Sequence, residues 1–240
     1  MELTYGNQTI DLFGKEHFPD GPPEKVVVSL SGGCDSSSLT YLIGTNFPNI
    51  DMYPFHTKDE DCPIDTERAI EVHQWLQNKF PKLHDLKVYT VSTSDPVWQA
   101  KAKEAMASPK GSLIVNGKKV SMWGTLNGCS KALQNRDKRS KMSLQYDAPV
   151  VMAMTSNPPV DVQKERGFYE VAERKRDPGE SKLKIMDTID KGGLTYQPFL
   201  RSDKKFVAGV FKEHNLMDSL YTLTKSCAWS QTLETCGKCF

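Results

Sequence analysis

The residues best suited to chemistry lie at positions 31–38, where the sequence reads Ser-Gly-Gly-Cys-Asp-Ser-Ser-Ser. Two glycines permit a tight turn and let the backbone approach a bulky anion. A helix that starts directly after them would offer unpaired N–H groups and a partial positive charge, and the serine hydroxyls add further donors. Asp35 would repel a phosphate unless it holds Mg²⁺ or caps the backbone. The segment therefore predicts a phosphate-binding turn, although it is neither a Walker A loop nor a dinucleotide-binding Gly-x-Gly-x-x-Gly motif.

The neighbouring residues predict the strand and helix that such a turn needs. Residues 25–30 form a β-branched apolar run typical of a parallel strand buried on both faces, and residues 36–43 carry apolar side chains at helical spacing. Residues 50–57, 65–80 and 86–92 then predict a strand, a helix and a third strand. This alternation predicts an α/β fold with a parallel sheet and right-handed crossovers.

The rest of the chain gives weaker signals. We expect a loose extension over residues 1–24, a hairpin over 111–120 around Asn116-Gly117, a helix over 123–134, a charged loop over 136–141, a buried strand over 148–155, a long polar region over 157–196 with a short helix at 162–174, and a helix over 203–213.

Composition excludes several classes of protein. The 240 residues include 31 Lys plus Arg and 30 Asp plus Glu, so a net charge of +1 gives no bulk electrostatic reason to bind DNA or membranes. No run approaches the ~18 apolar residues that span a bilayer. The first residues also lack the pattern of a secretion signal. We therefore expect a cytoplasmic protein whose six cysteines are thiols or metal ligands.

The hexapeptide at 31–36 resembles the PP-loop, Ser-Gly-Gly-x-Asp-Ser, of the ATP pyrophosphatase superfamily. The resemblance implies a Rossmann-like parallel sheet of the adenine nucleotide alpha-hydrolase type, with helices on both faces and a loop that grips the β- and γ-phosphates of ATP with Mg²⁺. It implies Asp35 and Ser36 as catalytic residues. Nucleotide contacts are expected from Ser29, Leu30, Ser31, Gly32, Gly33, Cys34, Asp35, Ser36 and Ser37, with Phe55, His56 and Thr57 near the adenine.

Some of these positions have an equally good structural explanation. His56 could instead be a histidine at a strand end whose hydrogen bonds are satisfied internally. Thr155, Ser156 and Asn157 follow the strand expected at 148, where open α/β sheets bind ligands, but the same residues also suit a simple turn.

Three cysteines near the end of the chain, Cys227, Cys236 and Cys239, are spaced Cys-x8-Cys-x2-Cys. Thiolates at this spacing bind Zn²⁺, but a closed structural site needs four ligands. The fourth ligand could be the terminal carboxylate, His214, Cys129, water or a partner chain. Alternatively, the three thiols carry no metal.

Residues 198–200, the helix from 203, residues 221–227 and residues 236–239 together resemble the C-terminal half of the 7-cyano-7-deazaguanine synthase (QueC) family. That family binds zinc through a cysteine-rich tail whose fourth cysteine would fall at position 242, beyond Phe240. Its Pro-Gly-Arg-Asn segment is not found in this chain. The resemblance divides the chain into an N-terminal extension (1–24), a PP-loop ATP-binding domain (25–200) and a C-terminal helix with a zinc-binding tail (201–240).

The same resemblance implies a reaction. ATP adenylates 7-carboxy-7-deazaguanine and ammonia displaces AMP; a second ATP then activates the amide, which becomes 7-cyano-7-deazaguanine (preQ0). The implied cofactors are ATP, Mg²⁺ and Zn²⁺, and the partners are the small deazapurine substrate and ammonia. Neither nucleic acid nor a membrane is expected as a direct partner, and a homodimer is the family's common assembly. Arg201 and Lys225 either contact phosphate or substrate or are solvated.

Three other interpretations stay open. Residues 234–237, Glu-Thr-Cys-Gly, partly match the Glu-Cys-Gly-Leu-His motif of sulfonucleotide (phosphoadenylyl-sulfate) reductases, although a Thr is inserted and the His is missing. The basic residues at 136–141 and 174–176 would suit a tRNA-modifying PP-loop enzyme. The third interpretation is a nucleotide-binding protein without synthetic activity.

Overall fold

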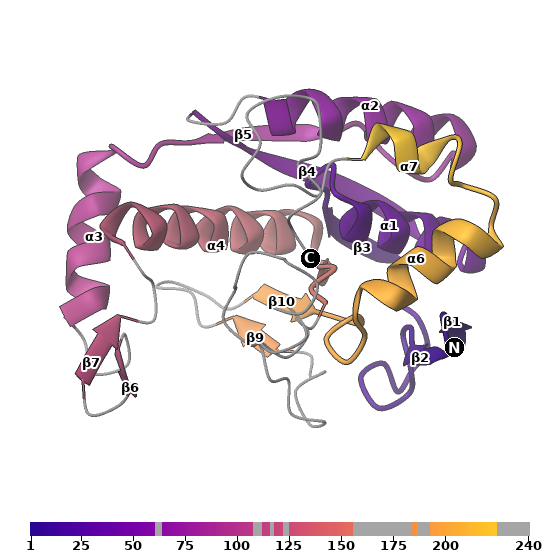
Figure 1. The fold of residues 1–240 in the computed structure, drawn as a ribbon, viewed down its shortest axis with the longest axis horizontal. Helices are drawn as coiled ribbons and strands as arrows, with labels where there is room; N and C mark the ends of the chain where they lie inside the picture. Colours follow the sequence, from indigo (N-terminus) through magenta and orange to yellow (C-terminus); the bar gives the residue numbers. More distant parts are fainter. Residues whose placement is uncertain are drawn as a thin grey trace, which may run out of the picture.

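The computed structural model describes residues 1–60, 64–107, 112–115, 118–121, 125–155, 184–186 and 193–224. A single sheet contains β3 (Lys25–Ser29), β4 (Asp51–Asp59), β5 (Lys87–Val91), β8 (Val150–Val151), β9 (Lys184–Met186) and β10 (Gly193–Tyr196). The strand order is β5-β4-β3-β8-β10-β9 (Figure 1). Only the edge strand β9 is antiparallel to its neighbour. The predicted parallel α/β sheet is therefore confirmed.

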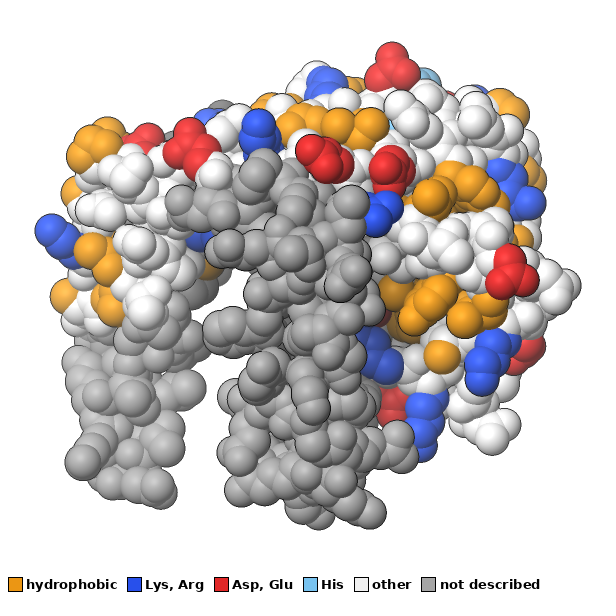
Figure 2. All heavy atoms as spheres, turned by 45° about the horizontal axis from the view of Figure 1, so that its top comes forward, with side chains coloured by type: hydrophobic (Ala, Val, Ile, Leu, Met, Phe, Trp, Pro, Cys, Tyr) orange, Lys and Arg blue, Asp and Glu red, His pale blue; other side chains and the backbone are white. Residues whose placement is uncertain are grey.

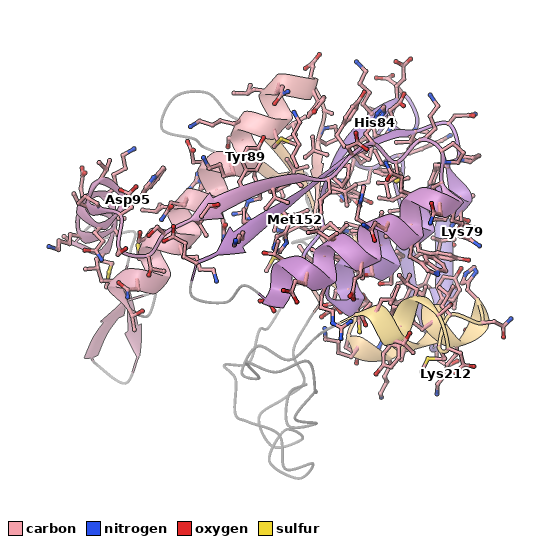
Figure 3. The ribbon with its side chains drawn as sticks, turned by 90° about the horizontal axis from the view of Figure 1, so that it is seen from above. Lys79, His84, Tyr89, Asp95, Met152 and Lys212 are labelled. Atoms are coloured by element: carbon pink, nitrogen blue, oxygen red, sulfur yellow. The ribbon has the colours of Figure 1, made fainter. Side chains whose placement is uncertain are left out.

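Helices cover both faces of the sheet because β3 is apolar on both. Val26 and Val28 pack into a large cluster with side chains of α1 (Cys34–Asn46), α2 (Ile64–Lys79), α6 (Lys204–Glu213) and α7 (Leu220–Leu223). Val27 points the other way, into a smaller cluster that includes Met142 of α4 (Leu126–Tyr146). Figure 3 shows the strands lying between α2 and α4.

The α4 helix corrects one expectation. We expected a helix that ends at residue 134 and a charged loop at 136–141, but α4 continues through this segment to Tyr146. Ser140, Met142 and Ser143 are buried on the same helix, so packing against the sheet keeps the segment helical despite its polar sequence. The helix ends at Asp147, which adopts a left-handed conformation (φ 48°).

The N-terminal segment is also more ordered than expected. β1 (Glu2–Tyr5) and β2 (Gln8–Asp11) form an antiparallel hairpin. Its two-residue turn places Gly6 and Asn7 at φ 55° and 61°, as a tight hairpin requires. A Cβ on Gly6 would lie 2.3 Å from the carbonyl oxygen of Lys205, so the turn packs directly on α6. Residues 2–11 of the expected loose extension therefore form a hairpin that packs on the main core.

The remaining elements complete the molecule. β6 (Ser112–Val115) and β7 (Lys118–Ser121) form the expected hairpin beside α3 (Pro96–Ala107), at one end of the molecule (Figure 1). The expected strand at 148–155 is confined to Val150–Val151. β9 and β10 come from the segment that we expected to be polar and irregular, whereas its expected helix at 162–174 lies outside the described residues. Within the described residues, no helix is both long and apolar enough to cross a bilayer.

Candidate active site at the carboxyl edge of the sheet

The predicted phosphate-binding turn lies at the point in the sheet where the order of strand addition reverses. From β3 the chain passes through α1 to β4 and through α2 to β5 on one side, whereas β8 pairs with the opposite side of β3. Open α/β sheets bind ligands in the crevice outside the carboxyl ends of two strands at such a reversal. Residues 30–33 leave β3 at this edge, and residues 152–155 leave β8 beside them.

Gly32 gives the turn its shape. Its φ is +78°, and a Cβ would lie 2.7 Å from the backbone nitrogen of Ala69 in α2. A side chain is therefore excluded both by the left-handed conformation and by the close approach of α2. Gly33 has an ordinary extended conformation (φ −86°, ψ 162°). Of the two glycines, Gly32 is the one whose backbone conformation requires glycine.

Ser36 ties the turn together. Its hydroxyl accepts from the backbone nitrogen of Ser31 at 3.1 Å, lies 3.0 Å from Ser31 Oγ and 3.2 Å from the carbonyl oxygen of Gly33. Ser37 Oγ donates to the same carbonyl at 2.8 Å, and Ser38 Oγ donates to the backbone carbonyl oxygen of Asp35 at 2.9 Å. These hydroxyls thus stabilise the turn and the first helical turn of α1.

The amides at the start of α1 are therefore the donors that this turn could offer to an anion. Gly33 occupies the N-cap position, and no side chain caps the helix. The first N–H groups of a helix have no intrahelical partner, and they carry the positive end of its dipole. Cys34 is half-buried here, with Sγ 3.0 Å from Thr224 Oγ1 at the end of α7.

Asp35 is the meeting point of three elements. Lys204 Nζ, in the first turn of α6, lies 2.5 and 2.6 Å from its two carboxylate oxygens. Thr155, which follows β8 and is buried, donates its hydroxyl to Asp35 Oδ2 at 3.1 Å. Lys204 is 169 positions away from Asp35 in the sequence. It carries the positive charge that the structure places on the loop, and no local sequence pattern indicated it.

The residues expected near the adenine lie on β4. Phe55 is buried against the α4 face, and its carbonyl accepts from the backbone nitrogen of Leu30 at 2.9 Å. His56 is buried, with Nδ1 3.0 Å from the Leu30 carbonyl and Nε2 3.2 Å from Thr66 Oγ1. Burial lowers the pKa of His56, and the hydrogen bond to Leu30 opposes this only in part. The structure thus favours an internal role for the His56 side chain, whereas Thr57 is half-buried at the end of β4.

The three predicted zinc ligands lie outside the part of the chain that the structure describes. Cys227, Cys236 and Cys239 lie outside the described residues, as do Ser156, Asn157 and Lys225. Two suggested fourth ligands are described, and both have other partners. His214 is 2.8 Å from Tyr5 Oη, and buried Cys129 contacts the Ala102 carbonyl at 3.7 Å. Within the described part of the chain, no three His, Cys, Asp or Glu side chains converge on a metal position.

Comparison with known proteins gives distant similarities. No protein-family model and no curated protein matches the sequence. Among solved structures, the fold is similar to U34-tRNA thiolase NcsA from Methanococcus maripaludis with its [4Fe-4S] cluster (TM-score 0.47, 13% identity), over 86% of this chain and 61% of the thiolase. It is also similar to NH3-dependent NAD synthetase from Campylobacter jejuni subsp. jejuni NCTC 11168 in complex with the nitrate ion (TM-score 0.41, 17% identity), over 86% of this chain and 70% of the synthetase. The chain thus spans less than two thirds of the thiolase, and similarities this distant carry no argument about function.

Proposed function

We propose that this protein is an ATP-dependent enzyme that transfers AMP to an anionic acceptor. The observation that carries the proposal is the uncapped start of α1, which follows Gly32 at the reversal point of a parallel sheet. Backbone amides at a helix N-terminus bind phosphate groups without needing a side-chain charge. The sequence resemblance of residues 31–36 to the PP-loop supports ATP as the nucleotide.

The charges around Asp35 suit a polyphosphate that arrives with Mg²⁺. Mg²⁺ is commonly held by one or two carboxylates together with substrate phosphates, and Asp35 is a carboxylate in the loop itself. When bound, the metal would offset phosphate charge. Lys204 neutralises Asp35 in the absence of nucleotide and turns to a phosphate oxygen when the carboxylate is engaged. Thr155 keeps the Asp35 carboxylate oriented during this exchange.

The acceptor that we propose is 7-carboxy-7-deazaguanine. Attack of its carboxylate on the α-phosphorus gives an acyl-adenylate and pyrophosphate. Ammonia then displaces AMP to form the amide, and a second adenylation followed by loss of AMP gives the nitrile. Support comes from the QueC-like segments at 198–200 and 221–227, and zinc binding by Cys227, Cys236 and Cys239 belongs to the same proposal.

One face of the molecule shows how its charges are distributed. On the face drawn in Figure 2, the described Lys and Arg side chains are interspersed with Asp and Glu rather than gathered into one basic field. Nucleic-acid-binding proteins concentrate positive charge on one face.

The deciding experiment is incubation with ATP, Mg²⁺, ammonium and 7-carboxy-7-deazaguanine, followed by detection of AMP and the nitrile. The matched control is Gly32→Ala, which should abolish AMP release. Binding of ATP without AMP release would refute the synthase, and release of sulfite from a sulfonucleotide would favour the reductase.

A further inference from the structure

A second cation near the same edge of the sheet, Arg139, has no carboxylate partner among the residues that the structure describes. Arg139 lies on α4, its Nε is buried without a hydrogen-bond partner, and its Nη1 makes a contact of 3.4 Å to the thioether sulfur of Met152. Among the described residues, no carboxylate pairs with it. Burial lowers the pKa of Arg139, and the nearby positive charge of Arg136 lowers it further. A desolvated guanidinium without a counter-charge is costly, so this arrangement calls for an anion.

The orientation of α4 places the Arg139 side chain toward the carboxyl edge of the sheet. In the first half of the helix, the Gln134 amide pairs with the backbone of Ser92, directly after β5 (3.2 and 2.8 Å). At its end, Tyr146 stacks on Tyr53 near the start of β4, with ring centroids 3.9 Å apart. The helix therefore runs opposite to the strands. Helical side chains lean toward the N-terminus, so Arg139 leans toward the carboxyl edge.

Met152 connects this cation to the phosphate-binding turn. It follows β8 directly and is central in the view of Figure 3. Thr155, three residues further on, contacts Asp35 at 3.1 Å. Three residues of extended chain span at most about 10 Å. An anion bound by Arg139 would thus lie within the length of a small molecule from the triphosphate site.

A second buried polar group without a hydrogen-bond partner limits which ligands would fit beside Arg139. Asn135 Oδ1 is also buried without a hydrogen-bond partner, and Asn135 lies one helical turn before Arg139 on the same face of α4. A guanidinium fork matches a planar carboxylate, and an amide oxygen accepts from an N–H group. We infer that Arg139 and Asn135 bind the acceptor of the proposed reaction, a small planar molecule that carries a carboxylate and, about one helical turn away, an N–H donor. This inference rests on the proposed function for the acceptor's identity.

Two substitutions test the inference by effects that a structural role would not produce. Arg139→Met removes a buried charge and keeps the volume, so the melting temperature should stay equal or rise. Asn135→Asp supplies an internal carboxylate four residues before Arg139, which should raise the melting temperature and block the site. Lys141→Gln is the matched control, because Lys141 lies on the exposed side of the same helix and pairs with Asp137.

The assay is titration of 7-carboxy-7-deazaguanine into protein saturated with a non-hydrolysable ATP analogue. Both test variants should weaken this binding at least ten-fold and leave affinity for the analogue within two-fold, whereas the control should change neither. A melting temperature several degrees lower in Arg139→Met, or unchanged acceptor binding, would overturn the inference. So would Arg139-dependent binding of tRNA in place of the acid, or absence of acid binding by the unaltered protein.

The two proposals fail in different ways. Formation of AMP and nitrile that is indifferent to Arg139→Met would keep the synthase and overturn the binding site. Arg139-dependent binding of the acid without AMP release would keep the binding site and refute the synthase.

Discussion

Replacing Lys204 with Met should make nucleotide binding depend much more strongly on Mg²⁺. In the unaltered protein, Lys204 Nζ lies 2.5 and 2.6 Å from the Asp35 oxygens, so the loop presents no net charge to an incoming phosphate. The Met side chain keeps most of the apolar stem and removes only the charge. Asp35 would then stand unpaired beside the site of a polyphosphate that carries the same sign of charge.

The size of the effect follows from the burial of the pair. The side chains of Lys204 and Asp35 are 30% and 20% exposed, so their interaction is stronger than that of a fully solvated ion pair. We expect about 1–2 kcal/mol, which corresponds to a roughly 5- to 30-fold loss of affinity for metal-free ATP. With saturating Mg²⁺ the loss should be smaller, because the cation supplies the counter-charge to Asp35.

The control is Asp35→Asn, which removes the charge that Lys204 neutralises. Metal-free ATP should bind this variant at least as well as it binds the unaltered protein, and Mg²⁺ should no longer improve its affinity. Titration calorimetry with ATP, with EDTA or with Mg²⁺, measures the affinity of the unaltered protein and of both variants in the absence and in the presence of the metal. If Lys204→Met changes the affinity for ATP by the same factor with and without Mg²⁺, the proposal that Mg²⁺ replaces Lys204 as the partner of Asp35 is wrong.

Substitutions at Gly32, His56 and Tyr196 test other parts of the structure. Gly32→Ala forces φ +78° on a residue with a Cβ and places that atom 2.7 Å from a backbone nitrogen; it should cost at least about 1–2 kcal/mol in urea unfolding and abolish ATP binding, whereas Gly33→Ala should be milder. Burial lowers the pKa of His56, so the unfolded chain takes up the proton first, and stability should fall as pH drops below about 6.5. His56→Gln should flatten that slope in urea unfolding between pH 7 and pH 5, and an unchanged slope would exclude His56 as its source. Tyr196 Oη donates to the Asp11 carbonyl at 2.7 Å and accepts from the backbone nitrogen of Phe13, just after β2, at 3.0 Å, so Tyr196→Phe should lower the free energy of unfolding by about 1–3 kcal/mol. No loss in that variant would contradict the packing of the N-terminal hairpin on the core.

Short-range patterns predicted β3, β4 and β5 because each strand has its own apolar run. Between these runs, apolar residues at helical spacing marked α1 and α2. The same method failed for 136–141, where charged composition suggested a loop although burial of Ser140 and Met142 holds the segment in α4. The N-terminal hairpin did have a local signal, since Gly6-Asn7 suits a two-residue turn, but the polar residues around it obscured the strands.

The candidate site divides in a similar way. The turn at 31–36 was readable from sequence because one short segment supplies its glycines, its serines and the start of its helix. Lys204 was not readable, because its relation to Asp35 exists only after α6 has packed beside α1. Arg139 was named only as part of a basic run, since nothing local shows which charge of that run is buried and unpaired.

The two cations near the carboxyl edge, Lys204 and Arg139, differ in whether an internal carboxylate neutralises them. Lys204 is neutralised by Asp35, so a nucleotide must compete with an internal ion pair and gains most when a metal engages the carboxylate. Arg139 has no such competitor among the described residues, so an acceptor carboxylate meets a guanidinium whose Nε is already buried away from water. Acceptor binding should therefore show little dependence on Mg²⁺, whereas nucleotide binding should depend on it strongly. Two anions can then occupy one edge of the sheet without facing each other's full charge, because each is met by a different cation.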